Sequence, residues 1–116
     1  MRHRIKKTIL DRKKAPREMM LRNLAASVLI YEKVSTTEAK AKAVRSLVEK
    51  LITIAKKNDL SSRRRLIALL PQPNAVKKLM EVIGKRYTDR KGGYTRIVRL
   101  NNRQGDGAKM VRIELV

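Results

Sequence analysis

The sequence predicts an α+β fold: a two-layer domain of about four helices packed on a small mixed or antiparallel sheet, with an extended basic N-terminal arm. Apolar residues recur at helical spacing over most of the chain, and two short β-prone runs lie near the C-terminus. Before residue 18 there are eight Lys and Arg residues, one acid and no sustained apolar period. We therefore expect an arm over residues 1–14 and a single globular domain over residues 15–116.

The first helix is expected to begin near Pro16, because proline suits the first turn of a helix. Leu21, Leu24, Val28 and Tyr31 then recur at helical spacing, with further apolar residues widening the stripe. A helix with so wide an apolar face is expected at the centre of the core.

A short strand and a long helix are expected next. Residues 33–37 are β-prone, and the helix that follows continues to about Lys57. Either Ser35 or Thr37 could cap this helix, since both stand just before Glu38, and the sequence leaves the choice open. Lys56 is expected on the outer side of the helix. The expected buried side carries Val44, Leu47, Val48, Leu51, Ile52 and Ala55.

Two shorter helices follow. Asn58-Asp59 ends the long helix, and Ser61 or Ser62 can cap a third helix that stops at a Pro-Gln-Pro segment. Asn74 is the candidate cap of a fourth helix, which is expected to end near Gly84. The third helix carries Leu66, Ile67, Leu69 and Leu70, and the fourth is expected to bury Val76, Leu79, Met80 and Ile83.

The C-terminal part of the chain predicts an antiparallel hairpin. Gly92-Gly93 signals a turn before residues 94–100, and a loop over residues 101–107 precedes the last run, residues 110–116. In that run the apolar residues alternate with Arg112 and Glu114, which is typical of a half-buried strand.

Composition excludes several classes of function. The chain has 30 Lys and Arg residues against 10 Asp and Glu, a net charge of +20, so we expect a polyanionic partner. It has no Cys, and its one histidine, His3, lies in the arm, so no thiol or Ser-His-Asp catalysis can be assembled. Gly105-Asp106-Gly107 fits a hairpin loop better than a dinucleotide site. We therefore expect that the protein is not an enzyme and that it binds no cofactor or metal.

The location and the mode of binding also follow from composition. No apolar run is long enough for a membrane span, and no secretory signal follows the basic N-terminus, so a cytoplasmic protein is expected. The only aromatic residues are Tyr31, Tyr87 and Tyr94. Such a chain cannot build a base-stacking platform, so binding should depend on phosphates and on the shape of folded nucleic acid.

The candidate contact residues form four groups. Each group also has an ordinary structural explanation. The arm could be a solvated tail, and Arg22-Asn23 could be an exposed turn of an amphipathic helix. Thr36-Thr37 could serve only as a helix cap, and Tyr94 could simply pack within the hairpin. Arg63-Arg64-Arg65 is equally well explained by a solvated helix face. The arm group is Arg2, His3, Arg4, Lys6, Lys7, Arg12, Lys13, Lys14 and Arg17; the others are Arg22 and Asn23; Thr36, Thr37, Lys40 and Lys42; and Arg90, Gly92, Gly93, Tyr94, Thr95, Arg96 and Arg103.

Motifs along the whole chain resemble one known family. They are Met1-Arg2-His3-Arg4, Arg22-Asn23-Leu24, Thr36-Thr37 with Lys40-Ala41-Lys42, Leu51-Ile52-Thr53 with Ala55-Lys56, Gly92-Gly93-Tyr94-Thr95-Arg96, Arg103 with Gly105-Asp106, and Ile113-Glu114-Leu115. In this order they resemble the seventeenth protein of the bacterial large ribosomal subunit. The chain departs from the usual pattern at Pro16-Arg17, where relatives often have His-Arg, and at Asp11, an acid in a normally basic arm.

The resemblance implies a structural, single-copy ribosomal protein that binds large-subunit ribosomal RNA near the exit of the peptide tunnel. It implies an α/β two-layer domain with a basic N-terminal extension, neighbouring ribosomal proteins as further partners, and no homo-oligomer. The alternative from another class is a DNA-coating or helix-turn-helix-like regulatory protein. Such a reader would concentrate base-contacting residues at one helix's N-terminal end, and no helix of this sequence does so.

Overall fold

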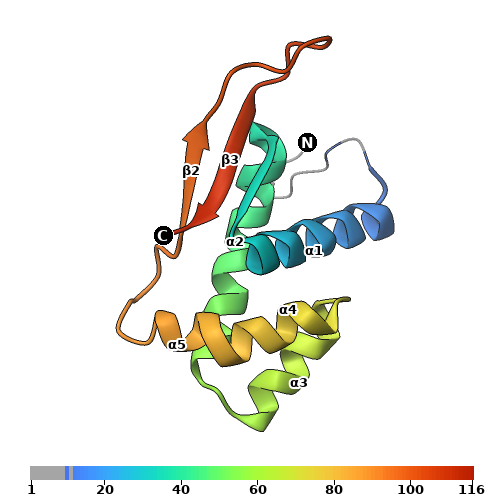
Figure 1. Ribbon diagram of the computed structural model, residues 1–116. Helices are drawn as coiled ribbons and strands as arrows, with labels where there is room; N and C mark the ends of the chain where they lie inside the picture. The colour runs from blue at the N-terminus through green and yellow to red at the C-terminus, as the bar shows by residue number, and fades with distance from the viewer. Residues whose placement is uncertain (1–9, 11) are drawn as a thin grey trace, which may run out of the picture.

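The computed structural model describes residue 10 and residues 12–116. The predicted contact residues Arg2, His3, Arg4, Lys6 and Lys7 lie outside the described residues. Within them, four helices pack on one three-stranded sheet, which confirms the α+β prediction (Figure 1). The first elements are α1 (Lys14–Tyr31), β1 (Lys33–Thr37), α2 (Glu38–Lys56) and α3 (Leu60–Leu69). The fourth helix is continuous and consists of α4 (Pro73–Lys78), the π-helical segment η1 (Leu79–Ile83) and α5 (Gly84–Arg86). The strands β2 (Thr95–Arg99) and β3 (Met110–Leu115) follow.

The sheet is antiparallel throughout and has the order β1-β3-β2, so the last strand of the chain is the central one. Ile113 of β3 lies opposite Val34 on one side and Ile97 on the other. Helices α1 and α2 pack on one face of this sheet (Figure 1). The predicted hairpin of residues 94–100 and 110–116 is confirmed, and β1 joins it as a third strand.

The core lies between the sheet and the helices. The predicted inward residues of α2 are buried, except that Leu47 is half-buried. Tyr31 was expected in the apolar stripe of the first helix, but it is 72% exposed because it is the last residue of α1 and points beyond the packed face. The largest fully buried side chains are Tyr94, Leu29, Leu51, Ile52, Leu66, Leu79, Ile83 and Ile113.

The boundary between arm and helix differs from the prediction. Helix α1 begins at Lys14, so this residue belongs to the helix and not to the arm. Lys13 precedes it in extended conformation and makes no side-chain capping bond. Pro16 therefore lies in the first turn, as the sequence indicated, and its missing N–H removes one donor that would have no helical partner there.

Of the two candidate caps of α2, Thr37 occupies the cap position, but its side chain makes no capping bond. Ser35, the other candidate, lies within β1. The Glu38 N–H instead donates to the Lys109 carbonyl at 3.0 Å, so backbone from the hairpin meets the start of this helix.

The N-cap residues of the third and fourth helices differ from the predicted ones. Asp59, rather than Ser61 or Ser62, caps α3 by accepting from the Ser62 N–H at 2.7 Å. This bond lowers the pKa of the Asp59 carboxyl. Asn74 lies inside α4, because Pro73 takes the first helical position and Gln72 precedes it.

Gly84 does not end the fourth helix, which continues to Arg86. The glycine is buried where this helix crosses α2, and a Cβ atom there would lie 3.0 Å from the carbonyl oxygens of Ala55 and Leu79. The residue is thus explained by close helix packing and not by a turn.

Glu32 connects the end of α1 to the fourth helix. Its backbone is left-handed, with φ 65°, and its N–H donates to the Val28 carbonyl. Its carboxylate accepts from Lys78 Nζ at 3.0 Å and from Arg86 Nη1. The hydrogen bonds from Arg86 and then from Lys78 lower the pKa of Glu32 to about 2, against the opposing effect of desolvation.

Replacing Glu32 with glutamine is expected to reduce the free energy of unfolding by about 1–2 kcal/mol at pH 7, since a one-third exposed carboxylate is partly screened by water. The folded pKa lies below the unfolded value of 4.5, so the carboxylate stabilises the fold above that pH and loses its effect as the pH falls toward about 2. Urea unfolding of both proteins at pH 7 and near pH 2.5 measures this. An equal difference between wild type and variant at both pH values would contradict it.

Candidate nucleic-acid interface

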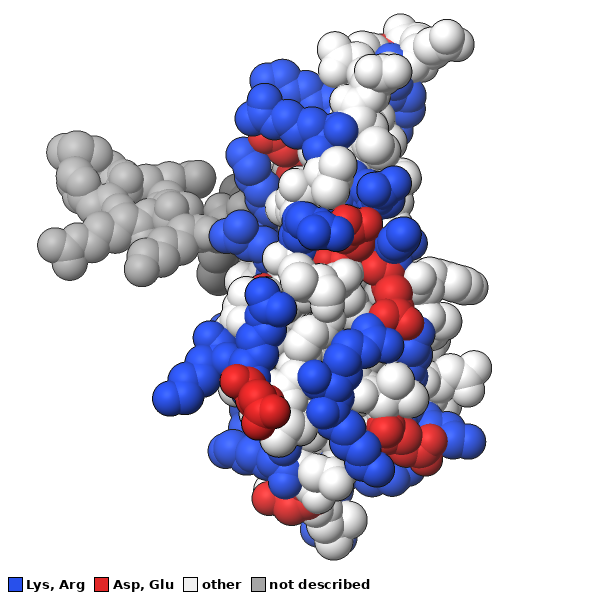
Figure 2. Space-filling view, turned by 60° about the vertical axis from the view of Figure 1, so that its left-hand side comes forward, with Lys and Arg blue, Asp and Glu red and all other residues white. Residues whose placement is uncertain are grey.

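Basic side chains cover much of the described surface. Figure 2 shows Lys and Arg from the hairpin end down to the helices, with scattered acidic side chains among them. Among the described residues, the ion pairs occupy the carboxylates of Glu32, Glu38, Asp106 and Glu114. These four acids are therefore placed beside cations within the domain, and many Lys and Arg side chains have no acidic partner in the part that the structure describes.

The described members of the first predicted group lie at the start of α1 and just before it. Lys13 and Lys14 are exposed, Arg17 is half-buried in the first turn, and the Arg12 guanidinium donates to the Leu10 carbonyl at 2.8 Å. Further along α1, Arg22 borders a shallow hollow of about 320 Å³ between α1 and α2. These residues place cations on the segment before α1 and along the first half of this helix.

Asn23 has a contact within the domain. Its side-chain oxygen accepts from Gln72 Nε2 at 3.2 Å, and the residue is exposed. The polar interruption of the first helix is thereby explained in part by packing against the segment before α4, while the exposed side chain still reaches solvent.

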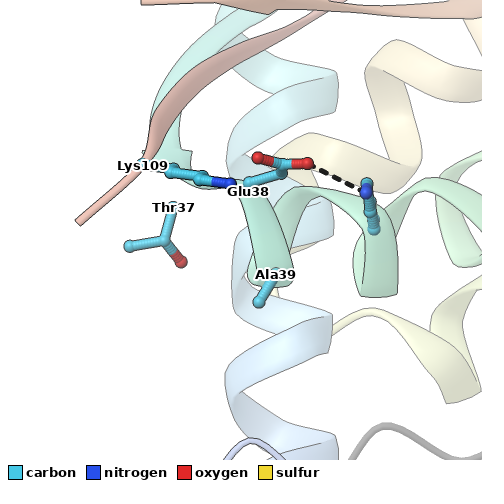
Figure 3. A pocket seen from close by; sticks show the side chains of 5 residues that line it. Thr37, Glu38, Ala39 and Lys109 are labelled. Atoms are coloured by element: carbon cyan, nitrogen blue, oxygen red, sulfur yellow. Dashed lines mark ion pairs between the residues drawn. The ribbon is translucent and has the colours of Figure 1, made fainter. Parts of the chain in front are cut away.

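The start of α2 forms a shallow hollow of about 450 Å³, lined by Thr37, Glu38, Ala39, Lys42 and Lys109 (Figure 3). The Lys42 ammonium pairs with the Glu38 carboxylate at 2.9 Å and lowers the pKa of that carboxyl. The positive end of the helix dipole therefore already has an acid beside it. Lys40 is half-buried, and Thr36 faces the core side of the sheet opposite Val111.

The Gly92-Gly93 segment is held by two residues of α2. Glu49 accepts from the N–H of Tyr94 at 3.1 Å and from the N–H and hydroxyl of Thr95 at 3.3 and 3.0 Å. Lys56 lies away from the buried stripe of α2, as expected, and its ammonium donates to the Tyr94 hydroxyl at 3.0 Å and to the Arg90 carbonyl. Both glycines have positive φ, +84° and +63°, so the turn requires them for its backbone conformation.

Tyr94 is a core residue. Its ring is 2% exposed and lies 5.2 Å from the ring of Tyr87. In this structure the ring has no surface on which a ribose or base could lie. This burial favours the ordinary packing alternative for Tyr94 over a contact between its ring and RNA.

Two of the predicted arginines make ion pairs within the sheet and its hairpin. Arg103 lies beside Asp106 at 2.5 Å, and together with the Ala108 N–H it lowers the pKa of Asp106 to about 2. Arg96 pairs with Glu114 across the strands at 2.6 Å. Both guanidinium groups remain about half exposed, whereas Arg90 is exposed near the glycine turn.

Several exposed residues were not assigned a role from the sequence. Lys33 and Arg112 flank Glu114 on the outer face of the sheet, and Lys109 borders the start of α2. The alternation along the last strand did place Arg112 outward. Lys33 gave no such signal, because its neighbour on the sheet comes from a strand about 80 residues away, in antiparallel pairing.

Metal-binding clusters and membrane-spanning helices are both absent from the part of the chain that the structure describes. Residues 10 and 12–116 contain no group of three His, Cys, Asp or Glu side chains placed to hold a metal ion. None of the helices described here combines the length and the apolar character needed to cross a bilayer.

A small α+β domain with so large an excess of Lys and Arg belongs to the class of basic proteins suited to a polyanionic partner. A family model described as Ribosomal protein L17 matches residues 20–116. A relative named Large ribosomal subunit protein bL17, from Solibacter usitatus, is 53% identical over 116 residues, which are 100% of this chain and 77% of the relative. The protein of the same name from Dehalococcoides mccartyi is 46% identical, covering 100% of this chain and 99% of its own.

The corresponding protein of Moorella thermoacetica is 53% identical over 107 residues, which are 92% of this chain and 96% of the relative. These matches extend over nearly the whole chain and confirm the resemblance drawn from the motifs. The chain belongs to the ribosomal protein L17 family.

Proposed function

We propose that the protein binds and stabilises folded large-subunit ribosomal RNA through phosphate and shape contacts. Membership of its family makes it a structural, non-enzymatic constituent of the bacterial large ribosomal subunit. The proposal adds the ligand, the contact residues and the physical basis of binding, and it includes neighbouring ribosomal proteins as partners and a single copy of the chain.

The observation that carries this proposal is the unbalanced charge. Even if each of the 10 acids neutralised one cation, 20 of the 30 Lys and Arg residues would remain without a counter-charge in the chain. Such an excess favours association with a dense array of negative charges, and the phosphate backbone of RNA provides one.

The proposed contact residues are the predicted ones, with Tyr94 removed because its ring is buried. The arm ahead of α1 is proposed to lie along RNA phosphates, while the domain, which begins with α1 at Lys14, contributes helix ends and the hairpin. The full set is Arg2, His3, Arg4, Lys6, Lys7, Arg12, Lys13, Lys14, Arg17, Arg22, Asn23, Thr36, Thr37, Lys40, Lys42, Arg90, Gly92, Gly93, Thr95, Arg96 and Arg103.

Affinity for structured large-subunit ribosomal RNA is expected to fall steeply with salt. Each phosphate neutralised by Lys or Arg releases counterions, so log affinity should decrease with log salt by roughly 0.9 per contact, taking the value for a B-DNA duplex as the reference. Filter binding of the full chain to transcribed ribosomal RNA at several salt concentrations measures the slope. An affinity that hardly changed with salt would overturn the proposal.

Duplex DNA of equal length serves as the competitor that tests the alternative function. We expect ribosomal RNA to displace the protein from DNA at matched phosphate concentration, because the contacts fit folded RNA. Equal or preferred binding to DNA would favour the DNA-coating alternative. In cells, a tagged copy is expected to sediment with the large subunit in a sucrose gradient, and its absence there would contradict the proposed role.

A further inference from the structure

The outer face of the sheet carries a compact group of charges that the proposed contact set includes only in part. Helices α1 and α2 cover the inner face, and none of the described elements covers the outer one (Figure 1). On the central strand, Glu114 lies directly opposite Lys33 of β1 and Arg96 of β2. Arg112 lies two residues before Glu114 on the same strand and face. We call Lys33, Arg96, Arg112 and Glu114 the sheet-face cluster.

Glu114 holds both arginines of this cluster. Arg96 donates from Nε at 2.8 Å and lies with Nη2 at 2.6 Å from the same carboxylate oxygen, Oε1. Arg112 donates from Nε at 3.1 Å to the other oxygen, Oε2. One carboxylate therefore fixes two guanidinium groups from neighbouring strands side by side.

The burial of these side chains is unequal. The Glu114 side chain is 3% exposed, whereas the Arg96 and Arg112 side chains are 59% and 39% exposed. The carboxylate is thus shielded from solvent, while the two guanidinium groups that pair with it reach the surface. Chiefly the Arg96 hydrogen bond, with Arg112 and Lys33 adding to it, lowers the pKa of Glu114, so the acid stays ionised.

The arginines retain donors for another ligand. A guanidinium has five N–H donors, and the bonds to Glu114 use at most two of those on Arg96 and one on Arg112. The cluster contains three cations and one acid, so it keeps a positive excess on an open surface. Fixed guanidinium groups of this kind match the phosphate oxygens of a nucleic-acid backbone.

We propose that the outer face of the sheet is a docking surface for the sugar-phosphate backbone of folded RNA, with Glu114 as its positioning residue. This inference depends on the proposed function, since it names a further surface for the same ligand. Arg96 and Arg112 contact phosphates, and Lys33 adds charge beside them. Glu114 itself does not contact RNA. It holds the two arginines in place, so that they lose less side-chain freedom on binding.

The proposal predicts an effect opposite to that of simple electrostatics. Removing an acid from a surface that binds RNA should strengthen binding, because one source of repulsion is lost. If Glu114 positions the arginines, the Glu114→Gln variant should instead bind more weakly, since the two guanidinium groups become mobile. The direction of the change therefore separates the two explanations.

The test measures affinity of the full chain for transcribed large-subunit ribosomal RNA by filter binding at moderate salt. Glu114→Gln is expected to weaken binding roughly three- to tenfold, as the ordering of one or two arginine side chains is lost. The matched control is Glu81→Gln, which removes the same charge from an exposed acid that makes no ion pair with other described residues. This control is expected to bind equally well or slightly more tightly.

A second comparison shows whether Glu114 acts through the arginines. In a chain that already carries Arg96→Gln and Arg112→Gln, the further change Glu114→Gln is expected to cause no additional weakening. For the double arginine variant alone, the slope of log affinity against log salt should be smaller by an amount that corresponds to roughly two lost phosphate contacts. It also provides a test of the surface if Glu114→Gln alone does not fold.

The outcomes are distinguishable from failure of the proposed function. If wild type and the Glu81 variant bind ribosomal RNA with steep salt dependence, while Glu114→Gln in a folded chain binds as tightly as wild type or more tightly, the positioning role is wrong. An unchanged salt slope in the double arginine variant would overturn the docking surface. If wild type itself does not bind ribosomal RNA, the proposed function fails.

Discussion

Replacing Tyr94 with alanine is expected to reduce the free energy of unfolding by about 3–5 kcal/mol, the usual cost of removing a large buried ring. The Tyr94 ring is nearly inaccessible and packs against Tyr87. Its hydroxyl accepts from Lys56 Nζ at 3.0 Å and donates to the Arg90 carbonyl at 3.2 Å. The variant therefore leaves a cavity and releases the segment before β2. Urea unfolding followed by circular dichroism measures the loss.

The matched control is Tyr94→Phe, which keeps the ring and removes only the hydroxyl. It is expected to cost about 1 kcal/mol, the net value of one ordinary hydrogen bond. Affinity of this variant for ribosomal RNA should equal that of wild type, because the hydroxyl is part of the domain's interior. An alanine variant as stable as wild type would contradict the role of Tyr94 in the core. A phenylalanine variant with normal stability and weak RNA binding would show that the Tyr94 hydroxyl contacts RNA.

The two tyrosines show what local sequence patterns can and cannot predict. Tyr31 continues an apolar stripe at helical spacing, yet the helix ends there and the residue is 72% exposed. Tyr94 follows a glycine pair among many cations, which suggested a surface loop, but Glu49 and Lys56 draw the segment onto α2. The spacing of apolar residues shows which face of a helix or strand is buried, but it does not show what packs beyond the end of that element.

The helices and the hairpin were predictable because neighbouring residues determine them. The 3.6-residue apolar repeat of α2 and the alternation along β3 each encode one buried face. The position of β3 between β1 and β2 was not predictable, since pairing of Val34 with Ile113 depends on contacts far apart in the chain. The same holds for the ion pairs of Glu32 and Glu114, which join separate elements.

The candidate interface was predicted in its composition more than in its geometry. Counting charges identified a polyanion-binding protein, because net charge does not depend on the fold. Which cations remain available does depend on it: Arg103 is paired with Asp106, and Lys56 is engaged with Tyr94 and Arg90. The acids of the chain thus select the available cations, and their partners appear only in the folded structure.

Gly84 is the position where a local signal gave the wrong structural reason, and it predicts a second large effect. A glycine near the end of an apolar pattern is typical of a helix end. Here the helix continues, and the missing side chain lets its backbone approach the Ala55 carbonyl of α2. A side chain at this position must push two helices apart, since the atoms it meets belong to backbone and cannot rotate away.

Replacing Gly84 with valine is therefore expected to reduce the free energy of unfolding by about 2–3 kcal/mol through overpacking. Gly84→Ala should change stability much less, because its single Cβ needs a shift of a few tenths of an ångström while alanine favours the helix by roughly 1 kcal/mol. Lys85→Val, at the next and exposed position, controls for the helix propensity of valine. Equal losses for Gly84→Val and Lys85→Val in urea unfolding would show that propensity, and not the contact with α2, determines the effect.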